Sequence, residues 1–289
     1  ISCKNGAKII VFPELCITGY TCGDLFLQEI LLREASAQLL CIAERTRGKD
    51  ALVMVGLPLE REGRLYNVAA VLRDGKILGM VPKANIPSYA EFYEGRHFAE
   101  GNAEPVPFSF MGRTVPFGTN ILFTCETLHG LTVGCEICED LWVADAPAVN
   151  HALKGATVIA NLSASNETIG KDEYRELLVK SVSARLLCGY VYASAGEGES
   201  TQDLVFGGHN LIAENGTILA QVKKFTCETL YGDIDVWKLL ADRRRMGTFG
   251  KEPEAAYVKV PFRLEVAETD LQRSFPALPF VPGDAEKRR

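Results

Sequence analysis

The sequence predicts a layered α/β domain with a mixed sheet. Short apolar runs, typical of buried strands, alternate with longer segments in which leucines recur at helical spacing. Two pairs of these runs are joined by Asp74-Gly75 and Asn215-Gly216, which are strong signals for tight turns between antiparallel strands. Alternating strands and helices favour parallel neighbours, and the hairpins add antiparallel ones, so a mixed sheet is expected.

The expected elements follow from the positions of the apolar runs and of the turn residues. Asp24 is a suitable cap for the first helix, and Gly189 is a natural stop for the third. The last helix finishes in Arg243-Arg-Arg245, which we expect to be a solvated helix end. In chain order we predict strands over 6–14, 51–58, 65–72, 77–82, 120–125, 131–137, 155–163, 190–194, 209–213, 217–222 and 231–236, and helices over 25–47, 145–153, 171–188 and 236–246.

The character of the chain changes after about Gly250. Five prolines punctuate this part, and no long periodic run occurs in it. We therefore predict one α/β domain over 1–250 and an extended tail or linker over 251–289. At the other end, the first residues look like the middle of a helix, so we expect a native N-terminal strand to precede them.

Composition and charge restrict the class of protein. The chain has 289 residues, of which 47% are hydrophobic and 24% charged, as in ordinary globular proteins with a large core. No apolar run approaches the roughly 20 residues of a membrane span, and residues 1–5 lack the basic start of a secretory signal. The net charge of −6 disfavours nucleic acid and anionic membranes as partners. We therefore expect a cytoplasmic protein.

Three of the predicted strands end at a reactive side chain, namely Glu14, Lys83 and Cys138. Sheet enzymes build their sites where strand ends converge. A thiol needs a base or a nearby cation to act as a nucleophile. Glu14 could take the proton from Cys138, while Lys83 and the backbone N–H groups after Cys138 could stabilise the oxyanion that follows. These residues predict a cysteine-dependent hydrolase.

Each of the three residues also has a structural interpretation. Glu14 could cap a helix, Lys83 could lie on the surface at the end of a hairpin, and Cys138 could be an inert buried thiol. The four histidines lie outside comparable strand ends, which makes a Cys–His protease less attractive.

The nine cysteines are scattered and odd in number, which indicates free thiols in a reducing compartment. Cys135-x-x-Cys138 could bind zinc or form a redox pair, but zinc would need a second pair at matching spacing, and a redox pair would open a helix. Strand alternation places Cys135 on the face opposite to Cys138 if the strand stays regular, so we expect Cys135 in the core. We expect four further cysteines to be core residues: Cys41, Cys125, Cys188 and Cys227.

Three blocks of the sequence resemble the signature blocks of the nitrilase, or carbon–nitrogen hydrolase, superfamily, and they occur in the family's order. They are Val11-Phe-Pro-Glu-Leu15, Val81-Pro-Lys-Ala-Asn-Ile-Pro87 with Tyr89 to Glu94, and Glu136-Ile-Cys-Glu-Asp140. The chain, from residue 1 to about Val281, also resembles the glutaminase domain of glutamine-dependent NAD synthetases. The stretches that carry this closer resemblance include Cys16-Ile-Thr-Gly-Tyr-Thr-Cys-Gly-Asp-Leu-Phe26, Ala160-Asn-Leu-Ser-Ala-Ser165, Ala195-Gly-Glu-Gly-Glu-Ser-Thr201 and Arg245-Met-Gly-Thr-Phe249.

The resemblance implies a four-layer α-β-β-α sandwich with mixed sheets, and hydrolysis of glutamine through a γ-glutamyl thioester. It implies Cys138 as nucleophile, Glu14 as general base and Lys83 as catalytic lysine, with Glu94 positioning that lysine. It also implies a set of substrate-binding residues. Position 171 is a lysine where we would expect an arginine, and a lysine cannot form a bidentate fork with a carboxylate. In this set, Tyr89, Ser165 and Lys171 would hold the α-amino and α-carboxylate groups of glutamine, Trp142 would either wall the pocket or pack in the core, and Glu139 would contribute its backbone N–H.

The same resemblance implies a second, synthetase half that this sequence does not contain. That half carries a Ser-Gly-Gly-x-Asp-Ser loop for the pyrophosphate of ATP, which does not occur here, and residues 275–282 resemble the linker before it. ATP and Mg²⁺ would belong to that synthetase domain, and the glutaminase step would need no cofactor and no metal. The expected partners are glutamine, the synthetase domain that uses ammonia to amidate nicotinic acid adenine dinucleotide, and further copies in a homo-oligomer.

Two other functions stay open from the sequence. One is a stand-alone amidase of the nitrilase type that acts on another small amide. The other is a trimmed domain that folds and oligomerises but is inactive alone, because closure of its active site would depend on the missing domain.

Overall fold

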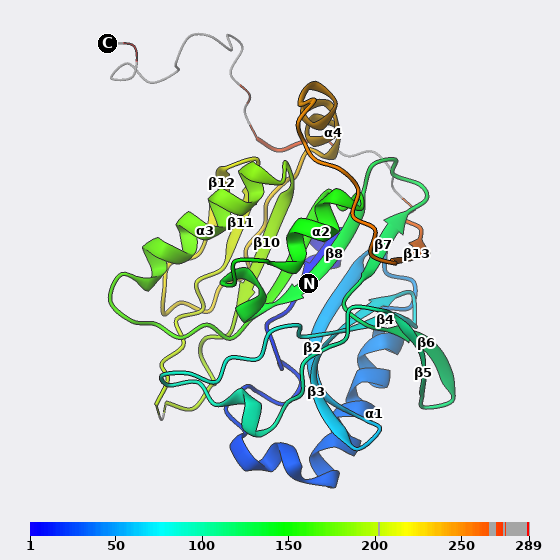
Figure 1. Cartoon of the computed structure of the whole chain (residues 1–289), viewed down its shortest axis with the longest axis vertical. Coiled ribbons are helices and arrows are strands. Elements are labelled where there is room, and N and C mark those ends of the chain that lie inside the picture. The colour runs from blue at the N-terminus through cyan, green and yellow to red at the C-terminus, as the bar shows by residue number, and fades with distance from the viewer. Residues whose placement is uncertain (202, 266–269, 274, 276–287, 289) are drawn as a thin grey trace.

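Two β-sheets form the centre of the molecule, and helices cover their outer faces (Figure 1). The computed structural model describes residues 1–201, 203–265, 270–273, 275 and 288. Within these residues, the six-stranded sheet has the order β1 (Ile9–Val11), β2 (Leu52–Arg61), β3 (Arg64–Arg73), β4 (Lys76–Pro82), β6 (Arg113–Phe117) and β5 (Val106–Phe110). The seven-stranded sheet has the order β12 (Thr217–Gln221), β11 (Leu211–Glu214), β10 (Gly189–Ser194), β9 (Val158–Ser163), β8 (Thr132–Ile137), β7 (Ile121–Cys125) and β13 (Val258–Phe262).

Both sheets mix parallel and antiparallel pairs, as predicted. β2, β3 and β4 form two successive hairpins, whereas β1 runs parallel to β2. In the other sheet β8, β9 and β10 run parallel, and β11 and β12 form the second predicted hairpin. Asp74-Gly75 and Asn215-Gly216 both have positive φ at each residue, which is the backbone conformation that a two-residue hairpin turn demands.

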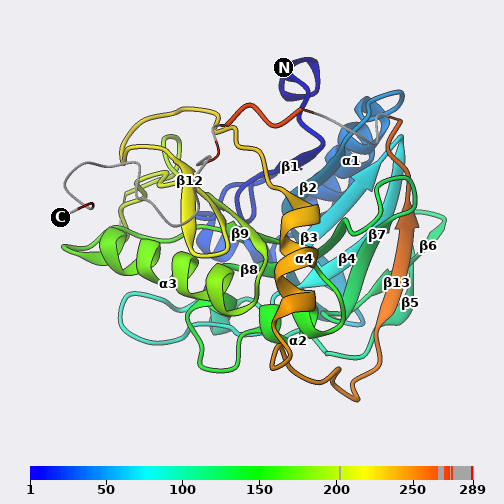
Figure 2. The same ribbon diagram turned by 90° about the horizontal axis from the view of Figure 1, so that it is seen from above.

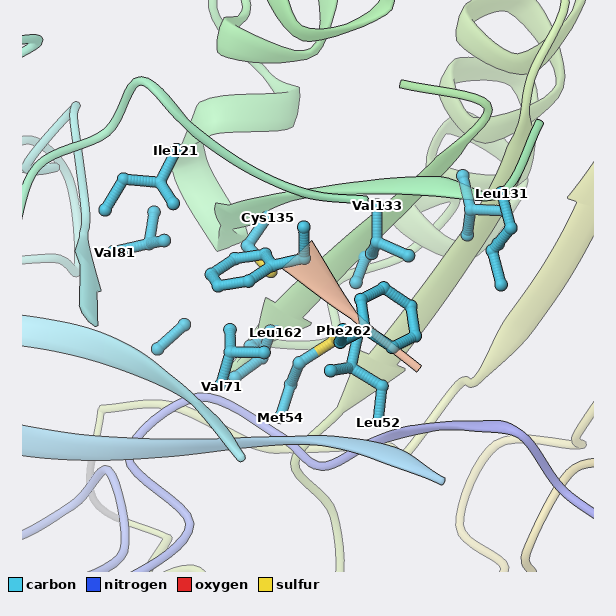
Figure 3. Packing of buried hydrophobic residues seen from close by; sticks show 14 of the residues in the cluster. Leu52, Met54, Val71, Val81, Ile121, Leu131, Val133, Cys135, Leu162 and Phe262 are labelled. Carbon is cyan, nitrogen blue, oxygen red and sulfur yellow. The ribbon is translucent and has the colours of Figure 1, made fainter. Parts of the chain in front are cut away.

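The main core lies between the two facing sheets (Figure 3). Leu52 and Met54 of β2 and Val71 of β3 pack in one cluster with Cys135 of β8 and Leu162 of β9, and each of these side chains is at most 1% exposed. The side chains that alternate with them along β2 point to the other face, where they join a second cluster beneath a helix. Because both faces of these strands are buried, their sequences are continuous hydrophobic runs and do not alternate with polar residues.

Helices form the two outer layers (Figures 1 and 2). α1 (Glu29–Arg45) packs on the outer face of the six-stranded sheet. α2 (Pro147–Leu153) and α3 (Lys171–Arg185) pack on the outer face of the seven-stranded sheet, and α4 (Val236–Arg245) follows near the same side. The succession of helix, sheet, sheet and helix is the four-layer α-β-β-α sandwich.

Several predicted element ends were wrong. The first helix begins at Glu29, not at residue 25, because Gly23–Leu27 forms a separate 3-10 helix and Gln28 is extended. Asp24 caps no helix, since its carboxylate accepts hydrogen bonds from Arg96, with N–O distances of 2.7 and 2.8 Å, and contacts the ring of His97.

The strand predicted over 6–14 is shorter than expected, and one predicted strand is absent. β1 covers only Ile9–Val11, and its side chains are partly buried. The segment 231–236 has no strand among its residues. α3 ends at Arg185 because the chain turns at Leu187, whose φ is +45°, and Gly189 already belongs to β10.

The arginine-rich end of α4 is only partly solvated. Arg244 and Arg245 are exposed, as predicted. Arg243 is instead half-buried and donates to the backbone carbonyls of Leu186, Leu187 and Ala156. These bonds attach α4 to the turn between α3 and β10 and to the segment before β9, so a charged side chain here contributes to packing.

The prediction of a structureless tail after Gly250 is wrong for part of that segment. β13 (Val258–Phe262) pairs in parallel with β7 and forms an edge of the seven-stranded sheet. Phe262 and Leu264 are buried in the core between the sheets. Pro261 is tolerated because an edge strand has one unpaired side. Most of the segment 275–282, which resembles a linker, lies outside the described residues.

The cysteines are free thiols that differ in their burial. Cys125, Cys135 and Cys188 are buried, as predicted, whereas Cys41 and Cys227 are exposed, so their assignment to the core was wrong. None of the helices in the described part of the chain is long and apolar enough to cross a membrane.

Candidate active site

Cys138 follows directly after β8 and opens the short 3-10 helix Cys138–Leu141. Its φ of +46° lies in the left-handed region, which costs a non-glycine residue about 1 kcal/mol or more. The backbone N–H of Cys138 donates to Oδ1 of Asn161 at 3.2 Å, and the N–H of Ile137 donates to the carboxylate of Asp140 at 2.9 Å. The strained turn is therefore held on both sides, with the thiol at the end of a rigid strand.

Glu14 lies in the turn after β1, where a close backbone approach fixes it. A Cβ atom on Gly56 of β2 would lie 2.3 Å from the backbone N of Leu15, so only glycine permits this contact. One oxygen of the Glu14 carboxylate accepts from Nδ2 of Asn67 at 2.6 Å, and the other accepts from the backbone N–H of Ala164 at 2.7 Å. The carboxylate is 1% exposed and is thereby fixed by both sheets.

Lys83, at the end of β4, lies between two carboxylates. Its Nζ is 2.8 Å from Oε1 of Glu14 and 2.7 and 2.9 Å from the two oxygens of Glu94. Glu94 also accepts from the hydroxyl of Tyr20 at 2.8 Å. Lys83 is 1% exposed and Glu94 is 6% exposed, so this cluster is buried. The structure thus brings Glu14, Lys83 and Glu94 into direct contact.

The charges of this cluster act on one another and on the thiol. Burial disfavours the charged form of Lys83, but Glu14 and Glu94 outweigh this effect, and the pKa of Lys83 lies well above its usual value. Burial also raises the pKa of Glu94, against the attraction of Lys83. Burial and the charge of Glu14 raise the pKa of the Cys138 thiol, while Lys83 lowers it. The resting thiol is therefore protonated at neutral pH.

A pocket of about 400 Å³ opens in front of Cys138. Every residue predicted from the resemblance to bind substrate lies on its wall, including Trp142, which had been assigned to either the wall or the core. The hydroxyl of Tyr89 donates to the carboxylate of Glu139 at 2.8 Å, and both residues line the pocket. The lining residues named in the sequence analysis are Tyr89, Cys138, Glu139, Trp142, Ser165 and Lys171.

Lys171, at the start of α3, lies between two aromatic rings of the pocket wall. Its Nζ is 5.2 Å from the ring centre of Phe92 and 5.1 Å from that of Trp142, distances at which cation–π attraction operates. It also donates to Oδ1 of Asn166, whose amide group in turn donates to Glu91. Burial lowers the pKa of Lys171. Among the described residues, no carboxylate forms an ion pair with this lysine, which therefore presents its positive charge to the pocket.

The structure adds residues to the site that the sequence analysis did not assign. Asn67 binds Glu14, and Asp140 accepts from both the backbone and the side chain of Asn85, at 2.9 and 2.8 Å, just after Lys83. Tyr20 binds Glu94. One signal was available for Asn67, which is a lone amide in the apolar run of β3. Asp140 lies in a quoted motif, but its partner comes from a segment more than 50 residues away.

The two cysteines of the Cys135-x-x-Cys138 motif lie in different elements, Cys135 within β8 and Cys138 in the 3-10 helix that follows. Cys135 is 1% exposed in the core between the sheets, and burial raises the pKa of its thiol to about 12. Cys138 and Cys135 are both free thiols. In the described part of the chain, no three His, Cys, Asp or Glu side chains form a group that could hold a metal ion.

Comparison with known proteins agrees with this geometry. A family model described as carbon-nitrogen hydrolase matches residues 2–244. The chain is 41% identical to the glutamine-dependent NAD(+) synthetase of Mycobacterium tuberculosis over 293 residues, which cover 98% of this chain and 43% of that protein. It is 28% identical to the human protein of the same name, over 87% of this chain and 36% of that protein. The chain thus spans less than half of these relatives and matches their N-terminal part.

Solved structures show the same fold. A glutamine-dependent NAD(+) synthetase from Cytophaga hutchinsonii superposes with a TM-score of 0.69 at 31% identity, over 77% of this chain and 36% of that one. An amidase of the nitrilase superfamily from Nesterenkonia superposes with a TM-score of 0.58 at 18% identity, over 76% of this chain and 75% of that one. By its sequence match over residues 2–244, this chain belongs to the carbon–nitrogen hydrolase family.

Proposed function

We propose that this chain hydrolyses the side-chain amide of glutamine, with Cys138 as nucleophile, Glu14 as general base and Lys83 as the cation that stabilises the oxyanion. The observation that carries the proposal is the buried contact of Lys83 with both Glu14 and Glu94, beside a strained cysteine at the floor of a pocket. Burying a lysine between two carboxylates costs desolvation free energy, and clusters of this kind are concentrated at catalytic sites.

The first half of the reaction forms a thioester and releases ammonia. The thiol proton of Cys138 passes to Glu14 as the sulfur attacks the side-chain carbonyl carbon of glutamine, and the carbonyl electron pair moves to oxygen. Lys83 and the backbone N–H after Cys138 stabilise this oxyanion. When the intermediate collapses, the C–N bond breaks, and Glu14 delivers its proton to the departing nitrogen.

The second half of the reaction restores the enzyme. Glu14, again a carboxylate, takes a proton from water as the water oxygen attacks the thioester carbonyl. The C–S bond then breaks, glutamate leaves, and the sulfur of Cys138 regains a proton from Glu14. The raised pKa of the Cys138 thiol supports this sequence, because a thiol that is protonated at rest needs a base to become a nucleophile.

The pocket wall suits an amino acid substrate. Lys171 carries a positive charge that no carboxylate of the described residues contacts directly, so it can pair with the α-carboxylate of glutamine. Ser165 adds a hydroxyl on the same wall, and the Tyr89–Glu139 pair provides an acceptor for the α-amino group. Trp142 closes the wall beside Lys171. Together these groups distinguish glutamine from a simple aliphatic amide.

The wider role follows from the relatives whose names specify glutamine and NAD(+). In such a synthetase the ammonia released at Cys138 would amidate nicotinic acid adenine dinucleotide in a second domain, which would use ATP and Mg²⁺. The glutaminase step itself would use neither cofactor nor metal. Association with that domain, and with further copies of the chain, belongs to the same proposal.

Ammonia release from glutamine by Cys138→Ala tests the proposal, with Cys135→Ala as the matched control. We expect the first variant to lose activity by about 10³-fold or more, and the second to keep it, because Cys135 packs in the core and faces no substrate. A panel of small amides tests the choice of substrate. Preference for an aliphatic amide over glutamine would replace the proposal with a nitrilase-type amidase, and no turnover of any amide would indicate a domain that is inactive alone.

A further inference from the structure

The Gly196–Thr201 loop after β10 contains a carboxylate that contacts the loop after Glu14. Both oxygens of Glu199 are used: one accepts from the backbone N–H of Tyr20 at 2.8 Å, and the other from the N–H and the hydroxyl of Thr21 at 3.1 and 2.7 Å. The backbone N–H of Ser200 donates back to the Thr21 hydroxyl at 3.0 Å. No residue of this loop takes part in the proposed reaction.

The loop that Glu199 holds is also attached to β2, because the N–H of Ile17 donates to the carbonyl of Gly56 at 3.1 Å. It follows Leu15, whose φ is +50°, and Gly19, whose φ is +90°, and it forms no strand or α-helix. The N–H groups of Tyr20 and Thr21 have no backbone acceptor among the described residues, and the Glu199 carboxylate satisfies them instead. A Cβ on Gly19 would lie 3.5 Å from the Glu199 carboxylate, which shows how closely the two loops meet.

Tyr20 connects this loop contact to the catalytic cluster. Its backbone is bound to Glu199, and its hydroxyl donates to Oε1 of Glu94 at 2.8 Å. That same oxygen of Glu94 is 2.7 Å from Nζ of Lys83. The Tyr20 ring packs edge-to-face on Phe206, with ring centres 5.6 Å apart, and it also packs against a second apolar cluster that includes Leu15 and Phe26. A displaced Tyr20 backbone would therefore move the hydroxyl away from Glu94.

We propose that Glu199 is a positioning residue for amide hydrolysis, which fixes Tyr20 and thereby the orientation of Glu94 and Lys83. The proposal rests on the proposed function, because it assigns Glu199 a part in the reaction at Cys138. Glu199 does not line the substrate pocket, so its effect should appear in the chemical step and not in substrate binding. A misplaced catalytic group slows a reaction even when the change lies outside the site.

The experiment compares Glu199→Gln, Tyr20→Phe and the double variant, with Glu197→Gln as the matched control. A glutamine at 199 keeps the size of the side chain but turns an NH₂ group toward a donor. Glu197 lies in the same loop and is exposed, and among the described residues its side chain has no hydrogen bond or ion pair. We expect each of the first two changes to lower kcat for glutamine about tenfold, with KM changed less than about twofold.

The double variant distinguishes a relay from two separate effects. If Glu199 acts through Tyr20, the double variant should lie within about threefold of either single variant, whereas independent effects would multiply to about 100-fold. A multiplied loss, a loss confined to KM, or an equal loss in Glu197→Gln would overturn the proposal. Thermal unfolding of each variant shows whether a loss of fold accounts for a loss of rate.

A second readout keeps the test independent of the substrate. Alkylation of Cys138 by iodoacetamide, followed by peptide mass analysis, reports how readily the thiol gives up its proton. We expect alkylation to slow about fivefold or more in Glu199→Gln and Tyr20→Phe, and to stay unchanged in Glu197→Gln. If the wild type fails to hydrolyse glutamine but the alkylation rates follow this pattern, the proposed substrate is wrong and the role of Glu199 stands. Unchanged alkylation in Glu199→Gln contradicts that role.

Discussion

Two lysines of the candidate active site, Lys83 and Lys171, have opposite environments. Lys83 contacts two carboxylates and is 1% exposed, and its pKa lies well above the usual value. Lys171 lies between two aromatic rings, and burial lowers its pKa. The charge of Lys83 is therefore already paired within the protein, whereas Lys171 forms no ion pair within 4 Å among the described residues and contacts two rings and an amide oxygen.

The different environments of the two lysines suggest different roles, one in the chemical step and one in substrate binding. A charge that is held by three hydrogen bonds in a buried cluster cannot move far, which suits the role that we propose for Lys83 in stabilising an oxyanion. A charge that lacks an anionic partner gains most when a substrate carboxylate arrives, so Lys171 is suited to binding. Changes around Lys83 should lower kcat, and changes around Lys171 should raise KM.

The largest effect is expected from Glu14→Gln, which removes the proposed base next to Lys83 while keeping the size of the side chain. We expect kcat for glutamine to fall about 10³-fold, because proton transfer from Cys138 and to the leaving nitrogen both depend on this carboxylate. KM should change little, since Glu14 does not line the pocket. Steady-state kinetics checks both values. A decrease in kcat of less than about tenfold would mean that Glu14 is not the base.

Gly56→Ala should disturb the same region through the backbone. The new Cβ would meet the backbone at Leu15 and displace Glu14, which should lower kcat by about 10-fold or more and the free energy of unfolding by about 1–3 kcal/mol. Gly247→Ala is the control, because a Cβ there meets nothing within 4 Å. Kinetics and denaturant unfolding measure the two effects. Normal turnover in Gly56→Ala would show that Glu14 tolerates displacement.

Lys171→Met should affect recognition instead. Without the ammonium group, the α-carboxylate of glutamine loses its charged partner, and we expect KM to rise about tenfold with kcat within about threefold of wild type. Lys171→Arg keeps the charge and serves as the control. A fall in kcat at constant KM would contradict the division of roles between the two lysines.

The smallest effect is expected from pH. Because burial lowers the pKa of Lys171, this side chain loses its proton at a lower pH than an ordinary lysine, whereas Lys83 keeps its proton. KM for glutamine should therefore rise about threefold toward alkaline pH while kcat stays level. Arginine at 171 does not titrate in this range and should abolish the rise. A rise in KM that persists in Lys171→Arg would point to another group.

Much of this site was predictable because its main residues each follow an apolar run. Lys83 and Cys138 come directly after strands, and the turn residues Asp74-Gly75 identify the hairpin that leads to Lys83. Cys135 lies in the core, as predicted, but not on a face opposite to Cys138, because Cys138 lies beyond the end of β8 and joins the same cluster. Such local patterns suffice when a side chain takes its position from the element that precedes it.

The remaining features depend on contacts between distant segments. β13 was missed because its pairing with β7 joins segments more than 130 residues apart, and because Pro261 disguises an edge strand. β5 and β6 were missed although they pair locally, because each contains a proline and the two prolines face one another. Asn67 and Tyr20 bind residues of the cluster through side chains whose partners no local pattern reveals.

Trapping the covalent intermediate tests the central claim most directly. The chain is mixed with glutamine, quenched in acid, digested and analysed by mass spectrometry. The thioester mechanism predicts the added mass of one glutamyl group on the peptide that contains Cys138, and none on the peptide of the Cys138→Ala variant. Release of ammonia from glutamine without an adduct in the wild type, and at an equal rate in Cys138→Ala, would contradict it.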